Sequence, residues 1–163
     1  MVAAYFSPKV NRYFGIDFAE SLLNSAIQRV QEAEFFEANA QDFEHLLPAK
    51  ADKSLLHFSF QYFEQDQEAK KVLAELIKAT KKGGLILISD IPDSRKWLKY
   101  YKSFKDKLRF VYQRFLGKED MGRFWSKRLL LEWCEDFGVK GEIIKQDLSL
   151  PYAHYRFDLL IRT

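Results

Sequence analysis

Short apolar runs alternate along the chain with longer stretches in which apolar residues recur at helical spacing. Four runs predict strands, at residues 10–17, 34–38, 54–60 and 85–89, and two amphipathic stretches predict helices, at residues 21–33 and 65–80. Strands that alternate with helices favour right-handed crossovers and a parallel sheet. Residues 1–6 have the pattern of the end of a helix, which Ser7-Pro8 interrupts.

The pattern changes in the second half of the chain. Residues 96–116 are predicted to be helical with a wide aromatic stripe, and residues 124–137 to form a helix that Gly138 ends. Two strand-like runs, at residues 141–147 and 156–161, follow with no helical segment between them, which predicts an antiparallel pair at the sheet's edge. The predicted fold is one α/β domain over residues 1–163, with a Rossmann-like, doubly wound, mostly parallel sheet and an antiparallel C-terminal hairpin.

Apolar residues make up 47% of the chain and aromatic residues 16%, which indicates a globular protein. The lone Cys134 excludes a disulfide framework and a Cys-based zinc site, and the three histidines lack metal-ligand spacing, so no metal is expected. No apolar run approaches the roughly 20 residues that span a bilayer. We therefore expect a cytoplasmic protein without a transmembrane segment.

Positive charge is concentrated in the basic aromatic block, residues 94–128. Residues 95–128 carry twelve Lys and Arg against three Asp and Glu, a net charge of +9, whereas the whole chain has +3 and the remainder therefore −6. Helical cations interleaved with aromatic rings are typical of surfaces that hold nucleic acid or an anionic membrane. A solvated helix face over an aromatic core is the plainer interpretation.

Asp17 ends the first predicted strand, and a predicted helix follows it directly. Doubly wound α/β domains present an acid to a ribose in this way, about 20 residues after a glycine-rich turn. Counting back that far from Asp17 passes Met1, so the glycine-rich turn is not in this sequence. The alternative for Asp17 is an ordinary acid at a helix N-terminus.

Five segments in order resemble the class I S-adenosylmethionine-dependent methyltransferases from their second strand onward. These are "YFGIDFAESLLNSA", "FFEANAQDF", "LLHFSFQYF", "LIKATKKGGLILISDIP" and the final "YRFDLLIRT". The family's acidic first strand and Gly-x-Gly loop have no counterpart. The resemblance therefore implies an N-terminally truncated domain that lacks its first strand. A strand missing from the centre of the sheet would expose edges and favour self-association or a rearranged sheet.

The resemblance also implies roles for individual residues. Asp17 would bind the ribose hydroxyls of S-adenosylmethionine, Phe18 would lie on the adenine, and Asn39 with the Ala40 backbone would meet the adenine edge. Phe58 and Ser59 would flank the methionine end. Core packing is the alternative for the aromatic residues, and Asp42 in the same segment is equally suited to cap a helix or turn.

Substrate-facing residues are expected at the tips of the later strands: Gln61, Tyr62, Asp90, Asp93 and His154. His57 is interpreted as a core histidine, and no catalytic residue is identified. The basic aromatic block lies where the family often inserts a lid over its substrate.

The expected function is methyl transfer from S-adenosylmethionine to a small-molecule acceptor, and whether the truncated form is active is left open. Two alternatives remain open. The chain is a nucleic-acid-binding or RNA-methylating module that uses the basic aromatic block, or it is a non-catalytic remnant of a methyltransferase.

Overall fold

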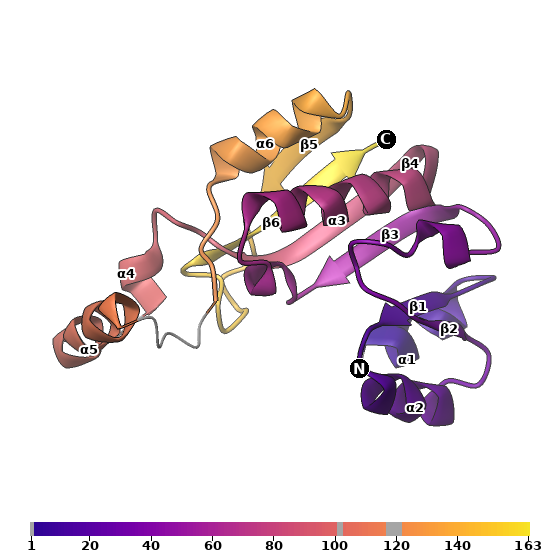
Figure 1. Cartoon of the computed structure of the whole chain (residues 1–163), viewed down its shortest axis with the longest axis horizontal. Helices are drawn as coiled ribbons and strands as arrows, with labels where there is room; N and C mark the ends of the chain where they lie inside the picture. Colours follow the sequence, from indigo (N-terminus) through magenta and orange to yellow (C-terminus); the bar gives the residue numbers. More distant parts are fainter. Residues whose placement is uncertain (1, 101–102, 117–121) are drawn as a thin grey trace.

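The structure is a computed structural model that describes residues 2–100, 103–116 and 122–163. Its strands form two sheets (Figure 1). The smaller sheet pairs β1 (Phe14–Asp17) with β2 (Glu34–Glu37) in parallel. The larger has the order β3-β4-β6-β5, from β3 (Ala51–His57), β4 (Thr80–Pro92), β5 (Lys140–Ile144) and β6 (Arg156–Arg162). The mostly parallel α/β fold is thus confirmed, although the sheet is divided.

Parallel and antiparallel pairs lie where the pattern predicted them. β3 and β4 are parallel and are connected through α3 (Asp66–Ala79), whereas β6 runs antiparallel to both β4 and β5. The C-terminal hairpin is therefore confirmed, with β5 at the outer edge of the sheet.

The main core lies between one face of the larger sheet and two helices, α3 and α6 (Lys127–Asp136). Ile86 and Ile88 of β4 and Leu159 and Ile161 of β6 are fully buried there. The capping box between Gln65 and Glu68 fixes the start of α3.

The opposite face of the larger sheet carries a row of three leucines. Leu55, Leu87 and Leu160 are register partners on β3, β4 and β6. Leu55 is 38% exposed and the other two are half-buried. Since apolar residues on a covered sheet face are normally buried, this face has the composition of a surface that another element would cover.

The smaller sheet packs with its own helices at one end of the molecule. α1 (Val2–Phe6), the short helix η1 (Ser7–Lys9) and α2 (Glu20–Arg29) lie with β1 and β2 (Figure 1). Ile16 of β1 packs against the main core. Within the described residues, β1, β2, β3 and β5 each pair on one side only, and the open edges include those of β1 and β3.

Several predicted boundaries are wrong. The strand predicted at residues 10–17 begins at Phe14, and the one predicted at 54–60 runs over Ala51–His57 and gives way to the short helix η3 (Phe60–Tyr62). The strand predicted at 85–89 is the longer β4, which begins at Thr80 directly after α3. A further short helix, η2 (Glu44–Leu46), precedes β3.

The helix predicted at 96–116 is two helices, α4 (Trp97–Tyr100) and α5 (Phe104–Phe115). The one predicted at 124–137 begins at Lys127, where the Ser126 hydroxyl accepts the Leu129 N–H. Residues 101–102 and 117–121 of the basic aromatic block lie outside the described residues. No helix in the described ranges is long and apolar enough to cross a membrane.

Candidate functional site

Asp17 ends β1 and faces the start of α2. Its Oδ1 accepts the backbone N–H of Ala19 at 2.9 Å, which is the helix-terminus role that the sequence left open. No described residue donates a hydrogen bond to Oδ2, so that oxygen can accept one from a hydroxyl group. Phe18, directly beside it, is 76% exposed and is therefore not part of the core.

Asn39 and Ala40 follow β2 at the same edge of the smaller sheet. The Asn39 Oδ1 accepts the Gln41 N–H at 2.9 Å in an Asx turn. Ala40 packs partly against the main core. The turn therefore holds an exposed amide side chain just beyond the strand.

His57 is the last residue of β3, and its expected place in the core is wrong. Its side chain is 44% exposed, because it lies on the face of the sheet opposite α3. Nδ1 lies 2.8 Å from the Ser89 Oγ and 3.4 Å from the Asp90 Oδ2. An imidazole backed by a carboxylate at the carboxyl end of a parallel strand is an arrangement suited to proton transfer.

Asp90 is fixed in place by its neighbours. Gln146 Nε2 donates to the Asp90 Oδ1 at 3.0 Å and to the Asp158 Oδ1 at 2.7 Å, and the Asp90 N–H donates to the same Asp158 oxygen. The Gln146 Oε1 is buried with no partner in the described part of the chain. Asp90 also has a left-handed φ of 63°, which is uncommon outside glycine and recurs at functional sites.

Arg156 begins β6 and is 3% exposed. It donates to the Asp90 carbonyl oxygen and to the Tyr155 hydroxyl, and its guanidinium lies 4.4 Å from the centre of the Phe58 ring. Phe58 has a φ of 56° and is 37% exposed. Burial raises the pKa of Tyr155, against the opposing effect of Arg156. The Arg156 guanidinium thus holds the Phe58 ring just beyond the carboxyl end of β3.

The next residues turn into η3. The Ser59 hydroxyl donates to the His57 carbonyl, and Gln61 is buried, donating from Nε2 to the Phe58 carbonyl while its Oε1 has no described partner. Tyr62 is 64% exposed. Gly122 has a left-handed φ and packs closely on the Gln61 backbone, so that a Cβ on it would lie 2.5 Å from the Gln61 carbonyl oxygen.

Asp93 lies at the base of the basic aromatic block and is fully engaged. Its Oδ1 accepts the Arg95 N–H, and its Oδ2 pairs with Lys127 at 2.8 Å. The backbone N–H of Trp125 donates to the carbonyl of Pro92, the residue before Asp93. These contacts join the two ends of the block, which favours a structural role for Asp93. His154 is exposed and packs edge-on against Tyr155.

The structure brings Phe58, Ser59 and Asp90 together at the carboxyl ends of β3 and β4, and it places Asp17 and Asn39 at the ends of β1 and β2. Sequence reasoning missed Gln146, Arg156 and Asp158. Two charges inside the apolar run "YRFDLLI" were the available signal. A hollow of about 440 Å³ between α6 and β5 contains none of the candidate residues.

A family model described as "Methyltransferase domain" matches residues 2–138. No curated protein matches the sequence significantly. Among solved structures, the fold is similar to that of an S-adenosylmethionine-dependent methyltransferase from Clostridium acetobutylicum, with a TM-score of 0.72 and 11% identity over 96% of this chain and 77% of the other.

Two further structures are similar. The N-methyltransferase NodS from Bradyrhizobium japonicum, in complex with S-adenosyl-L-homocysteine, has a TM-score of 0.68 and 13% identity over 99% of this chain and 71% of its own. An O-methyltransferase family protein from Burkholderia thailandensis has a TM-score of 0.60 and 16% identity over 91% of this chain. The chain spans only 42% of that protein's length.

Proposed function

Because the chain belongs to the methyltransferase domain family, we propose that it forms the larger part of a domain that transfers a methyl group from S-adenosylmethionine to a small-molecule acceptor. One observation carries the proposal. Within the matched region, Asp17 ends β1 and Phe58 directly follows β3, at the carboxyl ends of parallel strands, where open α/β sheets bind ligands.

The residues at the ends of β1 and β2 suit the adenosine half of this cofactor. Asp17 has one carboxylate oxygen on Ala19 and the second free to accept from the ribose hydroxyls. The exposed ring of Phe18 offers a surface for the adenine, and Asn39 offers an amide to its edge. The S-adenosyl-L-homocysteine bound by NodS supports this choice of cofactor.

The methionine half requires a part of the fold that the described residues do not provide. The open edges of β1 and β3, together with the uncovered leucine row of Leu55, Leu87 and Leu160, fit a further parallel strand and its helix. Such a strand would join the two sheets into one. We propose that its loop, beside Phe58 and Ser59, holds the methionine portion.

The acceptor would lie over the ends of β3 and β4. When bound, the cofactor supplies an electrophilic methyl group, and transfer depends mainly on aligning the acceptor atom with it. His57 would take the acceptor's proton at Nε2, since Nδ1 faces Ser89 and Asp90. Arg156 would keep the Phe58 ring in place against the acceptor.

The remaining candidates have different parts in this proposal. Tyr62 and His154 are exposed and could contact an acceptor, whereas the buried Gln61 offers an unsatisfied amide oxygen. Asp93 would act through the base of the basic aromatic block rather than on the acceptor.

Calorimetric titration with S-adenosyl-L-homocysteine tests the proposal, on this chain and on the same chain extended upstream in its natural reading frame. We expect binding by the extended form only. Asp17→Asn should weaken that binding about ten- to a hundredfold, because a charge-assisted hydrogen bond is lost.

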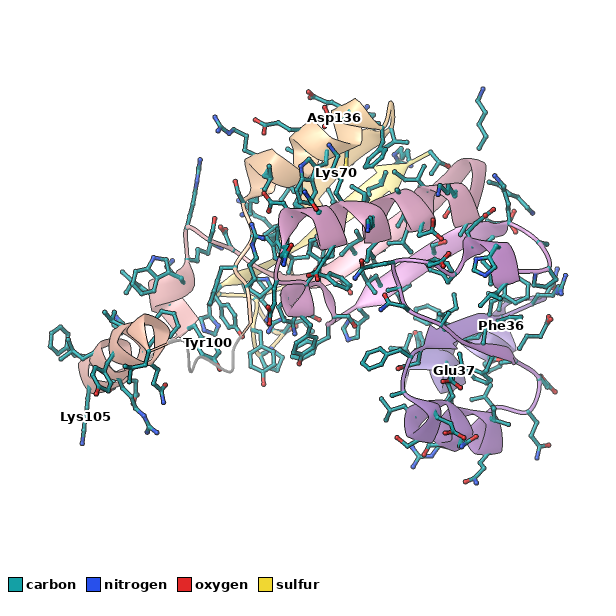
Figure 2. The ribbon with its side chains drawn as sticks, viewed as in Figure 1. Phe36, Glu37, Lys70, Tyr100, Lys105 and Asp136 are labelled. Carbon is teal, nitrogen blue, oxygen red and sulfur yellow. The ribbon has the colours of Figure 1, made fainter. Side chains whose placement is uncertain are left out.

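Glu37→Gln is the matched control, since Glu37 is the register partner of Asp17 at the end of β2 and is exposed (Figure 2). Binding by this chain alone would refute the requirement for a further strand. If neither form binds S-adenosyl-L-homocysteine, the result would favour a non-catalytic remnant of a methyltransferase.

A further inference from the structure

The helix α5 is amphipathic with its apolar side turned outward. Phe110 is buried and packs against Trp97, with 5.5 Å between ring centres. Four exposed residues make up the outward side, which we call the α5 apolar face: Phe104 (77% exposed), Leu108 (57%), Val111 (51%) and Tyr112 (65%). Their spacing of four, three and one residues places them on one side of a helix. A continuous apolar face this exposed is typical of an interaction surface.

Basic side chains border the α5 apolar face. At about 100° per residue, Lys105 and Lys107 fall on its two sides, and the exposed Arg109 follows beyond Lys105. None of the three forms an ion pair with a described residue. Figure 2 shows Lys105 at the end of the molecule, away from the sheets. Asp106, the acid of this helix, falls on the opposite side.

We propose that α5 binds an anionic lipid bilayer and lies in its interfacial plane. The apolar face would enter the boundary between headgroups and acyl chains, while Lys105 and Lys107 reach the anionic headgroups from either side. Bases of a nucleic acid would stack on aromatic rings, but along the helix axis the aliphatic Leu108 and Val111 separate Phe104 from Tyr112. The charge complementarity and the aliphatic centre together select a lipid surface.

The position of α5 permits this contact without disturbing the core. Figure 1 places α4 and α5 at one end of the molecule, apart from the main sheet and from the smaller sheet. Twelve helical residues extend about 18 Å, so the contact is peripheral and reversible. The inference is independent of the proposed methyl transfer.

Co-sedimentation with vesicles tests it, using phosphatidylcholine alone and phosphatidylcholine mixed with phosphatidylglycerol. The chain should bind only the anionic vesicles, and less at high salt. Leu108→Ser should lower the partition coefficient about tenfold through lost apolar burial. Lys107→Gln should lower it about fivefold through lost attraction to the surface. Leu148→Ser, a control at an 89% exposed leucine outside α5, should change nothing.

Three results would overturn the proposal. The first is equal partition onto neutral and anionic vesicles, or onto neither. The second is binding of a single-stranded RNA oligonucleotide, sensitive to Lys107→Gln, without vesicle binding. The third is a dimer in sedimentation equilibrium that Leu108→Ser dissociates, which would make the α5 apolar face a contact between two copies.

Discussion

The ion pair between the buried Asp93 and the partly exposed Lys127 should be one of the most costly salt bridges to break. The Asp93 side chain is 3% exposed and that of Lys127 33%, with 2.8 Å between charged atoms. Lys127→Met keeps the aliphatic stem but leaves the carboxylate with only the Arg95 N–H. Removing one partner of a buried pair leaves an uncompensated charge, so we expect a loss of about 3 kcal/mol in unfolding free energy.

The pair between Lys70 and Asp136 is a matched control. It joins α3 to α6 at 2.6 Å, and its side chains are 40% and 57% exposed (Figure 2). Lys70 also lies over an aromatic ring, Phe137, as Lys127 lies over Phe157. Because solvent screens an exposed pair, Lys70→Met should cost less than about 1 kcal/mol.

Urea unfolding followed by far-ultraviolet circular dichroism measures both losses. Added salt should abolish the small Lys70→Met effect and leave most of the Lys127→Met effect. Equal losses for the two variants would refute the claim that burial sets the strength of these pairs. Recovery of stability in a Lys127→Met, Asp93→Asn double variant would support it further.

Three other predictions concern the core. Burial opposes ionisation of Glu75, yet the backbone N–H groups of Glu44 and Phe43 and the Lys78 amine lower its pKa below 4.5. The ionised Glu75 therefore contributes its full stabilisation above pH 4.5, and this contribution is lost as the pH falls through the lower pKa of the folded state. Glu75→Gln should flatten the dependence of the unfolding free energy on pH in this range. Burial raises the Cys134 pKa to about 11, so the thiol should react with iodoacetamide at pH 8 only after unfolding, and rapid labelling of the native protein would contradict this. Gly141→Ala would bring a Cβ within 2.8 Å of the Cys134 sulfur, and a loss of about 1–3 kcal/mol in urea unfolding is expected; an unchanged midpoint would refute the close packing of α6 on β5.

The sequence predicted elements whose signals are local. α3 lies within one residue of its prediction at each end, because Val72, Leu73 and Leu76 repeat on one helical face. The antiparallel pair of β5 and β6 follows from the lack of a helix between two apolar runs.

The errors arise where tertiary contacts determine the backbone. β3 ends at His57 because Phe58 adopts a left-handed φ, which an apolar "HFSFQYF" run does not signal. β4 begins earlier than predicted because α3 passes directly into it at Thr80, whose hydroxyl donates to the Leu76 carbonyl.

The candidate site was predictable only in part. Asp17 and Asp90 were identified because each closes a predicted apolar strand; the structure places Asp17 at the end of β1 and Asp90 close to the end of β4, which runs on to Pro92. Gln146 and Arg156 join Asp90 across 56 and 66 residues of sequence, and no local pattern reports such contacts. His57 was misplaced because the neighbouring residues suggested two covered faces, whereas this face of β3 is open.

Amide chemical shifts would locate the proposed cofactor site most directly. The extended chain, isotopically labelled, would be titrated with S-adenosyl-L-homocysteine. We expect the largest shift changes at residues 17–19, 39–41 and 57–61, at the carboxyl ends of β1, β2 and β3. Saturable binding with its shift changes elsewhere, such as around the hollow between α6 and β5, would contradict it.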